Sequence, residues 1–387
     1  MIFLNKVSII HIVTVSLFVK LLALYMMPSL DFPDSKTYLT AGYELFNGGQ
    51  IEINNVMPIH PILAYLFKSS VLLKLLNIIF ATVSVFLVYK LVLIIFLEKR
   101  YALFAAFISA FYPYFIFYSI TGLTESLYIV LILSSFLLLY NKNFLLASIV
   151  IVLSILHRPT LDLLAPLLIF TFAFYVHKFN FKTSSLYVLK YLVVYVVLMS
   201  PWWYHQYNKY NQFVRLNLGD GIVWYSGNNP MNMSGGGVTG STKGDDMDMS
   251  IFSHIQDPIE KNNAMKQAAF EFIKENPNRF IELAGIKFIR FWRLWPYAPE
   301  YEKPLYIVIS ILSYGMVLLF SIVFLVQYLK QYFRTISPIL LLILYLTAVH
   351  MILIGSIRYR LPLEPFLIMF ASVASLKIYQ RFKGNPK

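Results

Sequence analysis

Four short segments of the chain combine carboxylates with basic or polar side chains in a way that could support chemistry. The first, LDFPDSKTYLTAGYELFNGG, starts at Leu30 and holds three acids directly after an apolar segment. The residues that stand out in the four segments are Asp31, Asp34 and Glu44; Glu125 in TGLTES; His157, Arg158 and Asp162 in HRPTLD; and Arg358, Arg360 and Glu364 in SIRYRLPLEP. A carboxylate can act as a general base, and arginine binds carboxylates and phosphates through its forked donors. Together these side chains could hold an anion and carry out acid–base chemistry.

Each of these residues also has a purely structural explanation. Asp34 precedes a helix-like stretch and could cap it, and Glu125 at a helix start would complement the helix dipole. Arg158 could meet lipid headgroups, and the Arg-Tyr-Arg run at 358–360 could anchor the chain at a membrane interface. Charges at or inside a membrane are costly, so a combination of them on one membrane face favours a functional site.

The composition indicates a membrane protein. Of 387 residues, 58% are hydrophobic and only 13% are charged, and the mean hydropathy is +0.66. A soluble domain usually carries about twice that share of charge. The net charge of +13 does not indicate a nucleic-acid partner, because the basic residues lie mostly between apolar runs, where they report topology. The lack of cysteine excludes disulfides and thiolate metal sites.

Apolar runs recur along the chain, and each is a candidate transmembrane helix of about 20 residues. The proposed spans are roughly 8–28, 71–96, 101–119, 124–140, 144–157, 160–176, 185–204, 304–327, 336–355 and 361–377. We therefore expect an all-α polytopic membrane protein with about ten spans. The span at 144–157 is short, so its hairpin could instead be re-entrant.

The loops between the spans alternate in charge. One set holds basic residues at 99, 100, 142, 178, 182, 330 and 334, and the C-terminal tail is basic too. By the positive-inside rule these loops and both termini are cytoplasmic. The segments 29–70, 120–123, 157–159, 205–303 and 356–360 then face outward. We expect a multi-pass protein of the inner or plasma membrane whose site lies on the outward or periplasmic face.

Three regions follow from this topology. Residues 1–204 form an N-terminal transmembrane module that includes the first outer acidic loop, 29–70. Residues 205–303 form a polar outer, periplasmic-side region, in which Asp257 before Pro258 and Asn276 before Pro277 predict two helix starts. Residues 304–387 form the last transmembrane helices.

Signatures for cofactors are weak. GGGVTG at 235–240 fits the dinucleotide pattern formally, but it does not follow a buried strand in a βαβ unit. DDMD at 245–248 lacks the glycine of an EF-hand loop, and no metal-ligand cluster is evident in the sequence. We expect no cofactor, although a divalent metal is not excluded.

The order of the motifs resembles a known family. Along the chain come PDSKTYLTAGYELFNGG, YPYFIFYSITGLTESLYIVLILSSFLLLY, HRPTLDLLAP, YSGNNP, KFIRFWRLWP and RYRLPLEPFLIMFA. This set resembles the C-type (GT-C) glycosyltransferases, and among them glycosyltransferase family 39, the superfamily of protein O-mannosyltransferases and lipid A aminoarabinose transferases. The resemblance covers nearly the whole chain. It implies a GT-C-like bundle of about ten transmembrane helices with an outward-facing cap of loops and helices.

The resemblance also implies roles for individual residues. It places a catalytic carboxylate in the first outer loop, where Asp34 fits best because it stands four residues before Tyr38 in a D-x-x-x-Y pattern. Asp31 is the second choice, and Glu125 matches a recurrent second acid. The positions expected to face the lipid phosphate are matched by Arg158, Arg358, Tyr359 and Arg360.

The function implied by the resemblance is transfer of a hexose or pentose from a polyprenyl-phosphate donor to a glycan, lipid or protein acceptor at the outer membrane face. Such a reaction needs a base for the acceptor hydroxyl and cations for the leaving phosphate. A multi-pass transporter or lipid flippase is the alternative, and it predicts inverted repeats and charges near helix midpoints. A non-catalytic envelope-assembly protein would leave the clustering unexplained. Convergence of Asp34, Glu125 and the arginines at a cavity open to one side distinguishes a transferase from a transporter.

Overall fold

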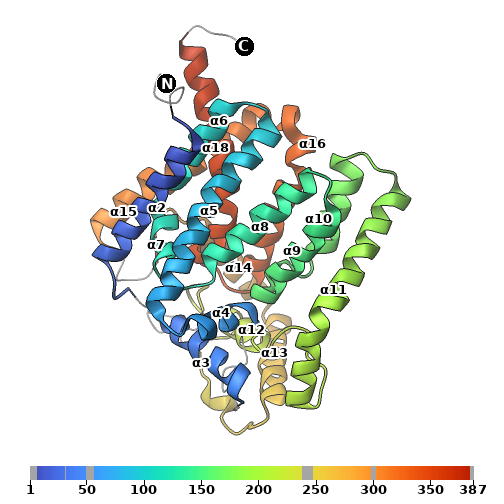
Figure 1. The fold of residues 1–387 in the computed structure, drawn as a ribbon. Helices are drawn as coiled ribbons and strands as arrows, with labels where there is room; N and C mark the ends of the chain where they lie inside the picture. The colour runs from blue at the N-terminus through green and yellow to red at the C-terminus, as the bar shows by residue number, and fades with distance from the viewer. Residues whose placement is uncertain (1–6, 31, 49–55, 238–246, 298–301, 384–387) are drawn as a thin grey trace.

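The computed structural model describes residues 7–30, 32–48, 56–237, 247–297 and 302–383. Within these ranges every regular element is a helix (Figure 1). In chain order the helices are α2 (Ile9–Met26), α3 (Pro33–Asn47), α4 (Ile59–Phe67), α5 (Ser70–Phe96), α6 (Lys99–Phe111), α7 (Pro113–Ser119), α8 (Glu125–Tyr140), α9 (Phe144–His157), α10 (Ala165–Phe170), α11 (Phe181–Tyr210), α12 (Asp220–Gly227), α13 (Pro258–Glu275), α14 (Pro277–Trp292), α15 (Pro304–Ser310), α16 (Met316–Ile352), α17 (Ile357–Arg360) and α18 (Glu364–Phe382). The predicted all-α class is confirmed.

Five helical stretches of the described chain are long and apolar enough to cross a membrane. They are α2, α5, α11, Pro304–Ile352 and Ile357–Phe382. The bent pair of α6 and α7 would be a sixth, and three apolar helices are shorter: Glu125–Tyr140, Phe144–His157 and Ala165–Val176. The prediction of a polytopic membrane protein is confirmed. Fewer full-length spans are found than the ten predicted. The predicted spans 124–140, 144–157 and 160–176 correspond to short helices, 304–327 and 336–355 belong to one helical stretch, and 101–119 is bent in the middle.

The predicted spans 304–327 and 336–355 fall within one stretch, Pro304–Ile352, in which no loop separates the helical segments. This stretch nevertheless turns back on itself. Tyr314 lies against the guanidinium of Arg360, at 3.4 Å from its ring centre. Arg360 also donates to the carbonyl of Phe291, and the ring of Phe291 stacks on His350. Tyr314 and His350 are therefore linked through only two intervening residues, although a straight helix would separate them by roughly 54 Å. The chain turns back between them, in the part that contains the helix-breaking Pro338.

The predicted span 101–119 is broken in the middle. α6 and α7 meet at a bend of 53°, and α7 starts at Pro113. Proline has no N–H to donate and disfavours helical backbone in the residue before it, so Tyr112 is extended. α7 then leads into the turn 120–124, from which α8 begins at Glu125.

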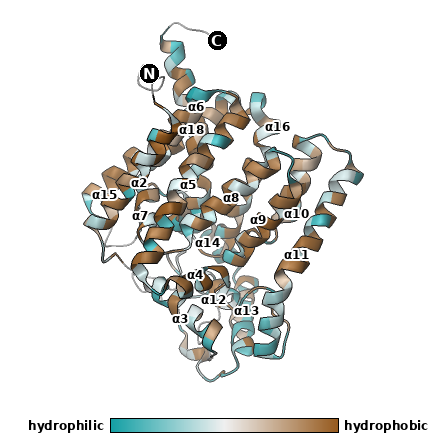
Figure 2. Ribbon diagram, viewed as in Figure 1, coloured by the Kyte–Doolittle hydropathy of each residue, from teal (hydrophilic) through white to brown (hydrophobic). Residues whose placement is uncertain are grey.

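The two ends of the helical body carry different segments (Figure 1). The start of α2 and the end of α18 lie at one end, whereas α3, α4, α12 and α13 lie at the other. The basic loops meet at the first end: Arg334 donates to the carbonyls of Tyr175 and Val176, and His177 donates to that of Leu139. Most of the helical body consists of hydrophobic residues, and hydrophilic residues gather on α13, at the end that also holds α3, α4 and α12 (Figure 2).

Burial separates central helices from peripheral ones. In the Ile357–Phe382 stretch 83% of the most apolar window is buried inside the protein, whereas α2 and α11 have only 17% buried. An apolar helix that is mostly uncovered is suited to face lipid. α18 is thus the centre of the body, and the short helix α17 positions its N-terminal end.

The predicted helix starts in the polar region are present. α13 begins at Pro258, and the Asp257 carboxylate accepts a hydrogen bond from the backbone N–H of Glu260 at 2.7 Å. Asn276 immediately precedes α14, but its side chain donates back to the carbonyl of Phe272 instead of capping.

Candidate active site

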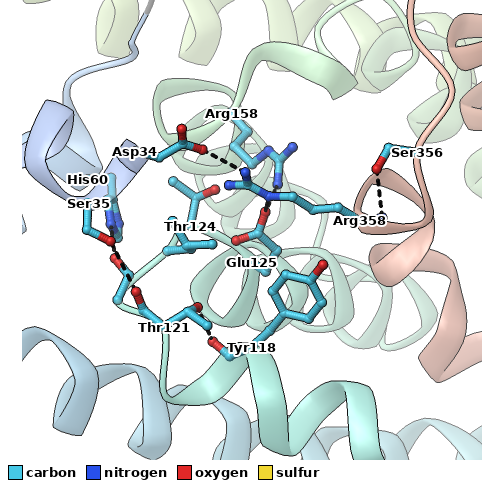
Figure 3. Close-up of polar contacts among 12 residues, drawn as sticks. Asp34, Ser35, His60, Tyr118, Thr121, Thr124, Glu125, Arg158, Ser356 and Arg358 are labelled. Atoms are coloured by element: carbon cyan, nitrogen blue, oxygen red, sulfur yellow. Dashed lines mark hydrogen bonds and ion pairs between the residues drawn. The ribbon is translucent and has the colours of Figure 1, made fainter. Parts of the chain in front are cut away.

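Four side chains singled out from the sequence meet at one point (Figure 3). Asp34 lies in the first turn of α3, and Glu125 is the first residue of α8. Arg158 directly follows α9, and Arg358 belongs to the short helix α17. Each of them sits at a helix end and not at a midpoint, so the charges collect at one end of the helical body. We refer to these four residues as the charge cluster.

Glu125 is the centre of the charge cluster. Its side chain is completely buried, and its Oε1 accepts hydrogen bonds from Arg358 Nε at 2.5 Å and from Arg158 Nη1 at 3.0 Å. A buried carboxylate can keep its charge only if nearby cations and hydrogen bonds replace the lost water. Two guanidinium groups provide that compensation here.

Arg358 joins the two acids, and Asp34 forms the open edge of the cluster. Arg358 Nη1 donates to Asp34 Oδ2 at 2.6 Å while its Nε donates to Glu125. The Asp34 side chain is 43% exposed, compared with 21% for Arg358 and 16% for Arg158. Asp34 is therefore the more accessible of the two carboxylates, with two partly exposed guanidinium groups beside it. The described residues hold no group of three or more histidine or acidic side chains placed to bind a metal ion.

Asp34 does not cap α3, so the structural alternative for this residue is wrong. The helix begins at Pro33, and Phe32 occupies the capping position, so Asp34 already lies inside the first turn. Proline is well suited to the first helical position because its φ angle is fixed near the helical value. Asp31, the second choice for a catalytic acid, lies outside the described residues.

Aromatic rings flank Arg158. Its guanidinium carbon lies 5.3 Å from the ring centre of Tyr128 and 5.7 Å from that of Tyr359. The Tyr359 ring stacks on His350, with the ring centres 4.7 Å apart. Tyr359 thus lies beside the charge cluster and touches it through Arg158. Its contact with a lipid phosphate stays a prediction.

Arg360 is not part of the charge cluster, contrary to the role predicted for it. Its side chain is fully buried, and its Nε donates to Glu364 Oε1 at 2.9 Å. Its Nη1 donates to two backbone carbonyls at the end of α14, and its guanidinium stacks on Tyr314. Residues two apart on a helix point about 200° away from each other, so Arg358 and Arg360 cannot face the same site. Arg360 instead anchors α17, the helix that carries Arg358.

Two further motifs support the backbone that leads to α17. Lys287 in KFIRFWRLWP donates through Nζ to Asn228 Oδ1 at 2.9 Å and to the carbonyl of Ile352 at 3.0 Å. Asn228 in YSGNNP also donates to the carbonyl of Ile352, at 3.0 Å. Burial lowers the pKa of Lys287 to about 7. Because Ile352 ends α16, both motifs fix the chain a few residues before Arg358.

Three residues near the charge cluster do not stand out in the sequence: Ser35, His60 and Asn77. His60 packs against Tyr38, one helical turn after Asp34, with the ring centres 4.5 Å apart. The available signal for His60 and Asn77 was a lone polar residue in an apolar stretch, such as KLLNIIF around Asn77, whereas Ser35 in PDSKT carries no such signal. Such residues in membrane segments usually have a specific polar partner.

The chain is similar in fold to solved structures of an archaeal oligosaccharyltransferase. No protein-family model matches the sequence, and no curated protein matches it. The oligosaccharyltransferase of Archaeoglobus fulgidus in its apo form matches 99% of this chain with a TM-score of 0.55 and 14% identity. The archaeal oligosaccharyltransferase AglB from Archaeoglobus fulgidus, in complex with an inhibitory peptide and a dolichol-phosphate, matches 99% with a TM-score of 0.53 and 15% identity.

The chain spans about half the length of these solved structures, 53% of the first and 52% of the second. At such low identity the likeness concerns the arrangement of helices alone. The GT-C-like fold implied by the sequence motifs is thereby confirmed, and the chain shares its fold with the archaeal oligosaccharyltransferase.

Proposed function

We propose that this protein is an integral membrane glycosyltransferase that transfers a sugar from a polyprenyl-phosphate-linked donor to an acceptor on the outer face of the membrane. The observation that carries the proposal is the charge cluster, in which an exposed carboxylate stands beside two guanidinium groups at one end of an apolar helical body. The shared fold supports it, as does the dolichol-phosphate bound to one of the similar oligosaccharyltransferases.

In the proposed reaction Asp34 accepts the proton of the acceptor hydroxyl while the hydroxyl oxygen attacks C1 of the sugar. The bond between C1 and the phosphate oxygen breaks, and its electron pair stays on the polyprenyl phosphate. Arg158 and Arg358 stabilise the negative charge that grows on this phosphate. Glu125, which is completely buried, holds both guanidinium groups in place. A single displacement of this kind inverts the configuration at C1.

The position of the charges favours this proposal over a transporter or lipid flippase. A transporter is expected to hold its substrate near the bilayer midplane, where both sides gain access in turn. In the described chain, all four residues of the charge cluster lie at helix ends. That placement suits chemistry at one membrane surface.

The direct test is an assay with purified protein and a panel of polyprenyl-phosphate hexoses and pentoses. We expect release of polyprenyl phosphate that depends on added acceptor, and we expect the matching glycan to disappear from the envelope when the gene is deleted, as measured by mass spectrometry. Movement of intact labelled lipid across vesicles, without cleavage of the sugar–phosphate bond, would establish transport instead.

The proposed orientation places the basic loops in the cytoplasm and the charge cluster outside. Because the natural sequence contains no cysteine, single cysteines report the side of the membrane without background. Both Lys142, between α8 and α9, and Ser253, before α13, are exposed. A membrane-impermeant maleimide should label Ser253→Cys in intact spheroplasts and label Lys142→Cys only after permeabilisation. Labelling of both from the same side contradicts the orientation.

A further inference from the structure

The turn that carries Glu125 is held by side chains from four different helices. Residues 120–124 join α7 to α8, and the backbone carbonyl of each of residues 121–124 accepts a hydrogen bond from a side chain. The pairs are Ser35 Oγ with Thr121 at 3.1 Å, His60 Nε2 with Gly122 at 3.1 Å, Asn77 Nδ2 with Leu123 at 2.8 Å, and His157 Nε2 with Thr124 at 2.8 Å. The donors come from α3, α4, α5 and α9.

All four donors are buried, so water does not compete strongly for these bonds. Their exposed fractions are 7% for Ser35, 1% for His60, 1% for Asn77 and 3% for His157. A carbonyl can only accept, so Nε2 carries the proton in both histidines. Burial lowers the pKa of His60 to about 4, which keeps its ring neutral at physiological pH.

Satisfying buried carbonyls is the simplest reason for these bonds, because an unpaired buried carbonyl is destabilising. The positions of two donors in the chain indicate a second role, because each is next to a residue of the charge cluster. Ser35 directly follows Asp34, and His157 directly precedes Arg158. The same turn therefore fixes the start of α3 and the end of α9 relative to Glu125. Figure 3 shows Ser35, next to Asp34 in the chain, hydrogen-bonded to the backbone carbonyl of Thr121 in the turn.

The two histidines also contact each other and link the turn to α3. Their ring centres lie 5.3 Å apart, and His60 packs edge-on against Tyr38 of α3. Gly122 in the turn has a φ angle of +71°, a backbone conformation that glycine adopts without strain. The turn is thus a tightly determined piece of backbone and not a loose connection.

We infer that Ser35, His60, Asn77 and His157 are positioning residues, which hold turn 121–124 and thereby set the spacing of Asp34, Glu125 and Arg158. This inference rests on the proposed function. None of the four needs to touch the substrate. Their contribution is to keep the base and the phosphate-binding arginines in one geometry, and a displacement of about 1 Å in a reacting group can lower a rate on the order of 10²-fold.

The test compares variants at His60 that differ in whether they can donate. His60→Leu removes the donor, and we expect kcat to fall by about 10- to 10²-fold while KM for the lipid donor changes by less than about threefold. His60→Gln keeps an amide N–H at a similar reach and should recover most of the rate. A purely structural role predicts less folded protein but an unchanged kcat per folded molecule.

A second variant, Ser35→Ala, tests the same role with a smaller change to the buried structure. Ser35→Ala removes one hydroxyl, and we expect a drop in kcat on the order of tenfold. Ser109→Ala is the matched control, because Ser109 is a buried serine in α6 whose hydroxyl has no hydrogen-bond partner among the described residues. Active wild-type protein together with a fully active, folded His60→Leu or Ser35→Ala overturns the positioning role alone. Wild-type protein that transfers no sugar overturns the proposed function itself.

Discussion

Replacing Arg358 by alanine is expected to lower the rate of sugar transfer by about 10²- to 10³-fold. Arg358 is the only residue of the charge cluster that contacts both acids, Asp34 at 2.6 Å and Glu125 at 2.5 Å. Removing Arg358 leaves the completely buried Glu125 with Arg158 as its remaining cation, and a buried carboxylate that loses compensation is destabilising. The variant also removes a cation that we propose stabilises the leaving phosphate. We expect kcat and KM for the polyprenyl-phosphate donor to change together.

Arg358→Lys separates charge from geometry. Lysine keeps the positive charge but cannot donate from two rigidly placed nitrogens to two carboxylates, so a loss of at least about tenfold should remain. Arg381→Lys is the matched control, since Arg381 lies in α18 at the opposite end and is exposed. If folded Arg358→Ala keeps more than a tenth of the wild-type rate, the proposed role of Arg358 in stabilising the leaving phosphate is wrong.

Replacing Asp34 by asparagine is expected to lower kcat by about 10²- to 10⁴-fold with little change in donor KM. The asparagine has nearly the same shape, and its amide oxygen can still accept a hydrogen bond from Arg358. The fold should therefore stay intact, and only the ability to accept a proton is lost. Rates are measured with saturating polyprenyl-phosphate sugar and compared with the melting temperature of each variant in detergent.

Asp257→Asn is the control for Asp34→Asn, because Asp257 is also an exposed carboxylate at a helix N-terminus, and it caps α13. A purely electrostatic role of Asp34 at the start of α3 predicts a stability loss of about 0.3–1 kcal/mol and normal turnover. If Asp31→Asn is inactive while Asp34→Asn is active, the base lies three residues upstream. If both variants are fully active, the carboxylate-base mechanism fails in this segment.

Much of the charge cluster could be predicted because charge is rare in this chain. Asp34, Glu125, Arg158 and Arg358 stand out against apolar surroundings, and the alternating loop charge predicts that they share one membrane face. The contact between Asp34 and Arg358 could not be predicted, because it depends on how α3 and α17 pack. Chain neighbours also need not share a site: Arg360 lies two residues from Arg358, yet it points into the protein toward Glu364.

Hydropathy predicted the class of the fold better than the number of its spans. Apolar length shows that residues 304–355 can lie in a membrane, but it does not show that the two predicted spans form one reversing stretch. Pro113 is visible in the sequence, but the size of the bend between α6 and α7 depends on packing. The roles of His60 and Asn77 were hidden for another reason: their partners are backbone carbonyls, which every residue has and which no sequence pattern marks.

The bridge between Asp34 and Arg358 joins residues 324 positions apart in the chain, and this has a consequence for biosynthesis. A membrane protein is made from its N-terminus, so α3 and α8 are synthesised long before α17. Until α17 arrives, Glu125 lacks one of its two arginine partners, and a buried carboxylate without full compensation is destabilising. A chain that stops before α17 is therefore an unstable intermediate that cellular quality control can recognise. The charge cluster can therefore assemble only after α17 has been synthesised, late in the production of the chain.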